Sequence, residues 1–201
     1  MEKISHLFLL ILSAISLLAF YEALFPVSAI VIMTRFLGLS AFFLLCLSLI
    51  LGPLALLKPS SFGQWLPARR AVGIAAFIFL AMHFILAFMY YFTLELDAIF
   101  ASLKYLVVLP ALLIFAAMAI TSFDSAIKKM GFSRWKLLQR LSYFAFVLSI
   151  YHFYLTANGL FVPLGSKVFL NLAELALFIL AVFTIVLQFM GFFAMRNKKK
   201  R

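Results

Sequence analysis

Long apolar runs separated by short polar stretches dominate the chain. Six runs fall at about 7–25, 36–57, 71–92, 105–121, 141–157 and 168–193. A helix that spans a bilayer needs about 20 mostly apolar residues, so the pattern predicts an all-α integral membrane protein with six transmembrane helices. The longest connection, about 122–140, leaves room for a turn or two of amphipathic helix. The whole chain, 1–201, is therefore predicted to be a single transmembrane domain.

The composition agrees with this pattern. Of 201 residues, 67% are hydrophobic, whereas an ordinary soluble domain has roughly 45–50%. A soluble enzyme and a disordered chain are excluded. The single cysteine, Cys46, lies inside an apolar run, so neither an intramolecular disulfide nor a cysteine-ligated metal is expected.

The basic residues predict the direction of the spans. The net charge is +11, and 14 of the 17 Lys and Arg lie near the N-terminus, between runs two and three, between runs four and five, or in the tail 196–201. Cytoplasmic loops of membrane proteins carry such an excess. We therefore expect a multi-pass protein of the cell membrane with both termini and the basic tail in the cytoplasm. The basic residues are expected to set the orientation of the spans and to contact the lipid bilayer, and no nucleic-acid partner is expected.

Two histidines lie inside predicted spans, where an ionisable group is costly and is a candidate for function. His83 follows Arg70 by 13 residues and His152 follows Arg140 by 12. At 1.5 Å per residue these separations are about 20 and 18 Å. Both rings are therefore expected at nearly the same depth, in the outer half of the membrane.

Each histidine shares its helix face with small residues. Steps of three or four residues lead from His83 to Gly73, Ala76 and Ala87, and from His152 to Ser142, Ala145, Ser149 and Thr156. Small residues also favour ordinary close packing of helices, so one interpretation is that the two helices simply pack against each other. The alternative is a flat ligand between the two helices.

The types of residue available limit the kinds of ligand that this site can bind. Two imidazoles are too few for zinc, which usually takes four ligands, and no carboxylate stands at matching depth for a proton pathway. Heme iron has four nitrogens from its macrocycle and needs two axial ligands from protein. We therefore expect one b-type heme, with His83 and His152 as the axial ligands of its iron.

Several motifs, in this order and spacing, resemble the ferric reductase-like transmembrane superfamily over a core of about residues 30–158. They are Arg35-Phe36-Leu37-Gly38, Leu51-Gly52-Pro53-Leu54, Arg69-Arg70-Ala71-Val72-Gly73, Met82-His83-Phe84, Thr121-Ser122, Trp135-Lys136-Leu137-Leu138-Gln139-Arg140-Leu141-Ser142-Tyr143 and His152. Within the superfamily the chain is most similar to MsrQ-type heme-binding membrane subunits, because both are short and lack a fused flavin and nicotinamide domain. The resemblance implies hemes between spans three and five.

One position departs from the family pattern. Members often read Leu-His-Arg-Leu where this chain reads Leu138-Gln139-Arg140-Leu141. Span three likewise offers no second histidine. A second, inner heme therefore lacks its ligands, and a single heme toward the outer side is expected.

Other residues receive supporting roles. Arg35, the only arginine expected at the outer interface, is either a partner of a heme propionate or an interface anchor. Ser149 is expected to help orient a histidine by hydrogen bonding. The basic loops can hold the phosphate of FMN, although topology explains their charge equally well. A quinone is the other candidate for a second cofactor.

The function expected from these features is that of a single-heme membrane cytochrome. It would be the electron-transfer membrane component of a ferric reductase-like or MsrQ-like oxidoreductase system, and no catalytic residue is predicted. The partners implied are a separate electron donor, either a quinol or a flavin reductase, and an acceptor on the outer side. The alternative is a hemeless scaffold or small transporter in which the histidines only link helices. The spans are unbroken apart from Pro110 in span four, and the two halves do not match, which makes the transporter less favoured.

Overall fold

The computed structural model describes residues 8, 11–17, 19, 29–156 and 168–198. This part of the chain is helical and contains no strand. Its elements are α2 (Ala29–Leu57), α3 (Pro59–Phe62), the 3-10 helix η1 (Gly63–Trp65), α4 (Ala68–Tyr90), α5 (Leu96–Phe100), α6 (Leu103–Leu106), α7 (Val108–Ile120), α8 (Asp124–Met130), α9 (Phe132–Thr156) and α10 (Val168–Lys198). The all-α prediction is confirmed.

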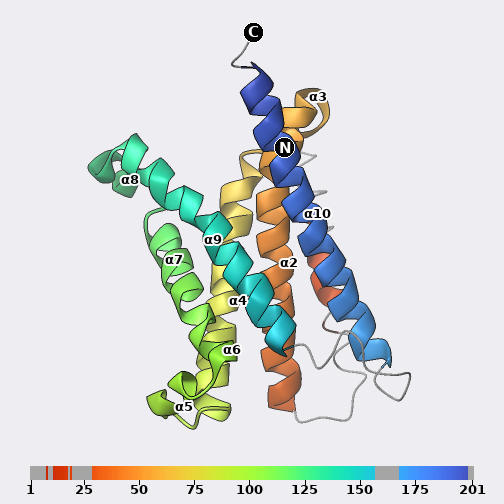
Figure 1. Ribbon diagram of the computed structural model, residues 1–201, viewed down its shortest axis with the longest axis vertical. Coiled ribbons are helices and arrows are strands. Elements are labelled where there is room, and N and C mark those ends of the chain that lie inside the picture. The colour runs from red at the N-terminus through yellow and green to blue at the C-terminus, as the bar shows by residue number, and fades with distance from the viewer. Residues whose placement is uncertain (1–7, 9–10, 18, 20–28, 157–167, 199–201) are drawn as a thin grey trace.

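Helix α2 is the centre of the bundle (Figure 1). It packs against α4 along one side and against α10 along the other, while α7 packs against α9. Buried residues occur along most of α2, including Leu44 and Cys46, which are almost fully enclosed. Its apolar character on all sides fits this central position, because a helix that is hydrophobic all round is normally surrounded by protein or lipid.

Aromatic stacking joins α9 to the centre of the bundle. The ring of Phe42 in α2 stacks on Phe153 with centroids 4.9 Å apart and on Phe146 with centroids 6.0 Å apart. All three rings are buried. Their contacts place the second half of α9, which carries His152, beside α2.

A glycine permits close contact between α2 and α4. The hydroxyl of Ser48 in α2 donates a hydrogen bond to the carbonyl of Arg69 at 3.1 Å. That carbonyl lies one turn before Gly73, and a Cβ at Gly73 would come 3.2 Å from the Ser48 Oγ. Glycine therefore leaves the approach to this carbonyl open, as small residues do at helix interfaces in membranes.

A proline explains one contact between α2 and α10. Pro53 has no N–H, so the carbonyl of Leu49, four residues earlier in the helix, lacks its usual donor. The side-chain amide Nε2 of Gln188 donates to this carbonyl at 2.6 Å. Gly191, about one turn further along α10, lets Pro53 approach closely, since a Cβ there would come 3.3 Å from the Pro53 ring. The amide of α10 thus satisfies a polar group that α2 leaves unpaired, as apolar surroundings require.

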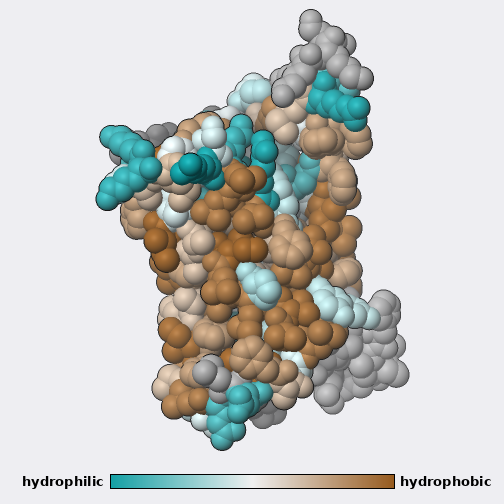
Figure 2. Space-filling view, turned by 60° about the vertical axis from the view of Figure 1, so that its left-hand side comes forward, coloured by the Kyte–Doolittle hydropathy of each residue, from teal (hydrophilic) through white to brown (hydrophobic). Residues whose placement is uncertain are grey.

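The surface shows an apolar band between more polar ends (Figure 2). Large apolar side chains point outward on α4, α7 and α10, for example Ile78, Leu113 and Phe189. In Figure 1, α3, η1, α8 and the last turns of α10 lie at one end of the bundle, and α5 lies at the other. The predicted cytoplasmic loops therefore share one end, as the charge pattern requires. Which side of a membrane this end faces stays a prediction.

Four described helices are long and apolar enough to cross a membrane, namely Ala29–Leu57, Ala68–Tyr90, Leu103–Ile120 and Ala173–Asn197. They correspond to the second, third, fourth and sixth predicted spans. The first predicted span, 7–25, lies largely outside the described residues. The fifth, 141–157, falls on α9, which has sufficient length but carries Gln139 and Arg140 in its first half and His152 in its second half. The six-span topology thus stays a prediction.

Several predicted boundaries were wrong. The segment 122–140 was expected to hold a turn or two, but it contains α8 and the first nine residues of α9. Helix α2 begins at Ala29 instead of about residue 36, because the apolar residues before Arg35 continue the helix. The fourth span runs from Leu103 to Ile120, close to the predicted 105–121, and its segments α6 and α7 meet at Val107, whose backbone is also right-handed helical. Helix α10 continues to Lys198, so the basic tail starts inside a helix.

Candidate functional site

His83 lies in α4 and reaches the backbone of α2. Its Nδ1 is 2.8 Å from the carbonyl oxygen of Thr34. In a helix this carbonyl points toward the residue four positions on, which is Gly38. A Cβ at Gly38 would come 2.9 Å from His83 Nδ1 and 3.0 Å from Cε1. The absence of a side chain at Gly38 is therefore what lets the imidazole reach Thr34.

His152 lies in α9 and has an equivalent backbone partner on another helix. Its Nδ1 is 2.6 Å from the carbonyl oxygen of Lys104 in α6. The Lys104 ammonium lies 4.7 Å from the ring centroid of Tyr105. Helix α6 packs against α9, which brings the Lys104 carbonyl to His152.

The two hydrogen bonds determine which ring nitrogen remains available. A carbonyl oxygen can only accept, so each Nδ1 must carry the proton and donate it. In a neutral imidazole the other nitrogen, Nε2, then has a free lone pair. Metal-bound histidines commonly show this arrangement, because the Nδ1–H bond fixes the tautomer and the ring orientation. Both histidines are thus held in the tautomer that can bind iron through Nε2.

Both histidines line one cavity of about 2090 Å³. Most of its walls are apolar side chains of α2, α4, α7 and α9, such as Phe77, Leu80 and Val108. Pockets for single small ligands usually measure about 300–1,000 Å³. The structure therefore brings the predicted pair to one space, and that space is larger than one ligand commonly needs.

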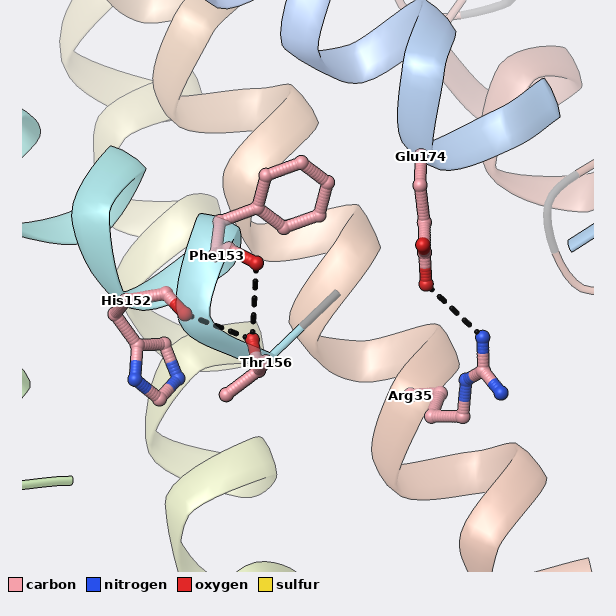
Figure 3. A network of polar contacts seen from close by, with 5 residues as sticks. All are labelled: Arg35, His152, Phe153, Thr156 and Glu174. Atoms are coloured by element: carbon pink, nitrogen blue, oxygen red, sulfur yellow. Dashed lines mark hydrogen bonds and ion pairs between the residues drawn. The ribbon is translucent and has the colours of Figure 1, made fainter. Parts of the chain in front are cut away.

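Arg35 and Ser149 also line this cavity. Arg35 Nη2 donates to Glu174 Oε1 of α10 at 3.1 Å, and the two side chains are 25% and 10% exposed. In Figure 3 this ion pair and the His152 ring point away from each other. Arg35 thus has a carboxylate from its own chain, and its contact with a propionate stays a prediction.

The predicted role of Ser149 also stays untested. Its hydroxyl donates to the carbonyl of Ala145 within α9 at 2.8 Å. The hydrogen bond that orients His152 comes from Lys104 instead. Thr156, one turn after His152, donates to the carbonyls of His152 and Phe153 (Figure 3). These hydroxyls satisfy backbone groups of their own helix.

The other end of the cavity, which we call the inner end, is lined by Trp135, Gln139, Arg69 and Arg140. It lies near the starts of α4 and α9, and the histidine pair marks the outer end. Gln139 stands there in place of the histidine of the family pattern and offers an amide, which cannot replace an imidazole as an axial ligand. In the described part of the chain, no three His, Cys, Asp or Glu side chains gather to bind a metal ion on their own.

Two groups at the predicted boundary of the membrane have shifted acidity. Burial raises the pKa of the Tyr91 phenol, which lines the outer end of the cavity, and the charge of Arg35 opposes that change. At the opposite end of the bundle, the Arg70 guanidinium bonds to Asp124 at 2.8 Å and lowers the pKa of that carboxyl. The second contact fastens α8 to the beginning of α4.

Sequence reasoning found the histidines but missed the groups that hold them. The carbonyls of Thr34 and Lys104 are backbone atoms, and no residue type identifies them. Gly38 belongs to a motif already noted in the sequence, and its position after Arg35 gave a signal that went unused. A glycine on the face of one span toward a histidine of another indicates close approach of the ring to the backbone.

The family profile described as "Ferric reductase like transmembrane component" matches residues 37–150. This match covers more than half of the chain and includes His83. The chain therefore belongs to the ferric reductase-like transmembrane family and is a component of a membrane redox system.

A curated relative gives a further comparison. The chain is 35% identical over 132 residues to the magnetosome protein MamZ of Magnetospirillum gryphiswaldense. The alignment covers 62% of this chain and 19% of that protein. The chain thus spans about a fifth of the length of this relative. No solved structure matches the chain significantly.

Proposed function

We propose that the protein is a membrane cytochrome that holds one b-type heme between α4 and α9, with His83 and His152 as axial ligands. The observation that carries this proposal is the pair of Nδ1 hydrogen bonds to the carbonyls of Thr34 and Lys104. They leave two Nε2 lone pairs for one shared cavity. Two imidazoles complete the coordination of a heme iron, so the donor set fits the cofactor.

The residues of the chain would set the properties of this site. When bound, the heme supplies one-electron redox chemistry. The Thr34 and Lys104 carbonyls hold the two rings in the required tautomer, and Gly38 leaves the space that the His83 ring occupies. Apolar side chains such as Phe77 and Leu80 line the cavity, and an apolar surrounding influences the redox potential of such a group.

We propose a single heme because the inner end of the cavity provides Gln139 and no histidine. Arg35 is the proposed propionate partner and Ser149 the proposed polar neighbour of the ligands. Electrons would enter from the cytoplasmic side or the membrane, from a quinol or from a flavin reductase. FMN is the flavin proposed for the basic inner end. The acceptor would lie on the outer side, as expected for an MsrQ-like component of a cell membrane with cytoplasmic termini.

Absorption spectroscopy of the purified protein tests this proposal. A dithionite-reduced sample should show the Soret and α bands of a six-coordinate b-type heme, at one heme per chain. His83→Ala and His152→Ala should each abolish these bands. Gln139→Ala is the matched control and should keep one heme. Protein that binds no heme when expressed with ample heme would contradict the proposal and favour the scaffold alternative. Two hemes per chain would contradict the single-heme assignment.

A further inference from the structure

The side chain of Lys104 brings a cation to the outer end of the cavity, in addition to the backbone carbonyl that holds His152. Lys104 is half-buried and lines the cavity together with both histidines. A flexible four-carbon stem joins the ammonium to the backbone of this residue, and the carbonyl of the same residue lies 2.6 Å from His152 Nδ1. The positive charge is therefore tethered close to one histidine of the pair.

Two aromatic rings fix the position of this charge. The Lys104 Nζ lies 4.7 Å from the centroid of the Tyr105 ring, which is within the range of about 6 Å for a cation–π interaction. The Phe92 ring meets the Tyr105 ring edge to face, with centroids 4.6 Å apart and an interplanar angle of 88°. Both rings line the cavity. The ammonium thus rests on a ring that is itself held by a second ring.

A strained turn keeps Phe92 in place. Thr93 and Leu94 follow it directly and have φ angles of 47° and 66°, in the left-handed region that β-branched and bulky residues rarely adopt. The N–H of Leu94 donates to the carbonyl of Phe88 at 3.2 Å, and the N–H of Glu95 donates to the carbonyl of Phe92 at 2.7 Å. Such a backbone persists only where the surrounding structure enforces it. Here it accompanies a Phe92 side chain that is 7% exposed.

The charge of Lys104 is not neutralised by a carboxylate of the described residues. The ion pairs in this part of the chain join Arg35 to Glu174 and Arg70 to Asp124, and neither includes Lys104. Salt screens a partly buried charge less than a fully exposed one. Lys104 therefore contributes net positive potential at the outer end of the cavity, where the charge of Arg35 is offset by Glu174.

We infer that Lys104 raises the midpoint potential of a heme bound by His83 and His152. Ferric heme has one more positive charge than ferrous heme, so a fixed cation nearby disfavours the oxidised form. Lys104 thus acts twice on the same site, since its carbonyl orients His152 and its ammonium sets the local potential. The inference rests on the proposed function, because it concerns the cofactor of that site.

A redox titration of the purified protein tests this inference. The protein is placed in neutral phosphatidylcholine nanodiscs, and the heme α band is followed at constant ionic strength. Lys104→Gln removes the charge and keeps the backbone carbonyl, so the heme content should be unchanged. At the midpoint of the unmodified protein, the ratio of reduced to oxidised heme should fall about 3- to 10-fold. For a one-electron couple this change is about 30–60 mV.

Two matched variants separate charge from other effects. Lys104→Arg retains a cation and should keep the midpoint potential of the unmodified protein. Lys129→Gln makes the same chemical change at an exposed position of α8, at the end of the bundle opposite α6 (Figure 1), and should also leave it unchanged. Far-UV circular dichroism verifies that each variant is folded.

The aromatic support of the ammonium is tested separately. Tyr105→Leu releases the ammonium toward solvent and should lower the midpoint potential, by less than Lys104→Gln does. Tyr105→Phe retains a ring for the cation and should leave the midpoint potential unchanged. In the Lys104→Gln background, Tyr105→Leu should cause no further shift, because the ring acts through the charge.

Three results would overturn the inference. They are an unchanged midpoint potential in Lys104→Gln, an equal shift in Lys129→Gln, and loss of heme from Lys104→Gln, which would make the ammonium an anchor for the heme. Each of these results leaves the proposed function intact, since the unmodified protein still shows its heme bands. An unmodified protein without heme contradicts the proposed function, and the inference fails with it.

Discussion

Gly38 of α2 stands where any side chain would collide with His83 of α4, because a Cβ at this position would come 2.9 Å from the imidazole Nδ1. The Nδ1–H of the same ring donates to the carbonyl of Thr34, one turn earlier in α2, and this hydrogen bond fixes the orientation of the ring. The glycine and the carbonyl act together, since a side chain at residue 38 would cover the oxygen that the ring must reach.

Gly38→Ala should therefore displace the His83 ring and lower heme retention. The clash involves a ring held between two helices, and overpacking of this kind typically costs about 1–3 kcal/mol. We expect less heme per chain and a weaker α band in the purified variant. Gly63→Ala is the matched control, because nothing lies within 4 Å of a Cβ at Gly63. Full heme content with an unchanged spectrum in Gly38→Ala would show that this glycine does not position the ligand.

Gln188→Leu should destabilise the contact of α10 with α2. The variant leaves the Leu49 carbonyl without the amide donor that it now has at 2.6 Å, and Pro53 cannot supply an N–H. We expect a loss of about 0.5–2 kcal/mol, the range for hydrogen bonds between helices in membranes. Unfolding can be followed by the reaction of a thiol dye with Cys46, the single and fully buried cysteine.

A double-mutant cycle supplies the control for this effect. In Pro53→Ala, residue 53 has an N–H that can bond to the Leu49 carbonyl within the helix. The Gln188→Leu substitution should then cost less than it does beside Pro53. Equal costs in the two backgrounds would mean that the glutamine acts independently of the proline.

The Arg35–Glu174 pair should show energetic coupling between α2 and α10. Arg35→Gln and Glu174→Gln each remove one partner of a contact whose side chains are only 25% and 10% exposed. The coupling energy from thermal unfolding of both singles and the double is expected at about 0.5–3 kcal/mol. The exchange Arg35→Glu with Glu174→Arg should recover part of the loss. Strictly additive effects would show that the pair contributes no interaction of its own.

The Asp124 carboxyl should titrate below its ordinary value of 3.8. The hydrogen bond from Arg70 is the main cause, the charge of Arg70 adds to it, and Lys128 contributes less. Because the folded pKa is lowered, the contact stabilises the fold above pH 3.8, and this contribution disappears as the pH falls through the folded pKa. Carboxyl-carbon NMR should find the pKa returning toward 3.8 in Arg70→Gln. Lys128→Gln should change it less, and an equal change in both would reject the ion pair as the main cause.

The sequence alone determined the membrane character, the helical class and the candidate histidines of this protein. Apolar runs of about 20 residues have few stable alternatives in a bilayer, because every backbone polar group must be satisfied inside its own segment. His83 and His152 could be selected because a polar group among apolar residues is costly and needs a reason. Their common depth is a prediction from counting residues along regular helices.

Tertiary structure decided how those histidines are held. The Thr34 and Lys104 carbonyls come from other helices, and hydrogen bonds between backbone and side chain across a bundle depend on the crossing of helices, which a linear pattern does not encode. The same is true of Gln188, whose partner is explained by a proline 135 positions earlier in the chain. Arg35 was expected either at a propionate or as an interface anchor, and its partner in the structure is a carboxylate of α10. Periodicity specifies which residues share a face of one helix, whereas the partner of that face is fixed by packing between helices that are distant in sequence.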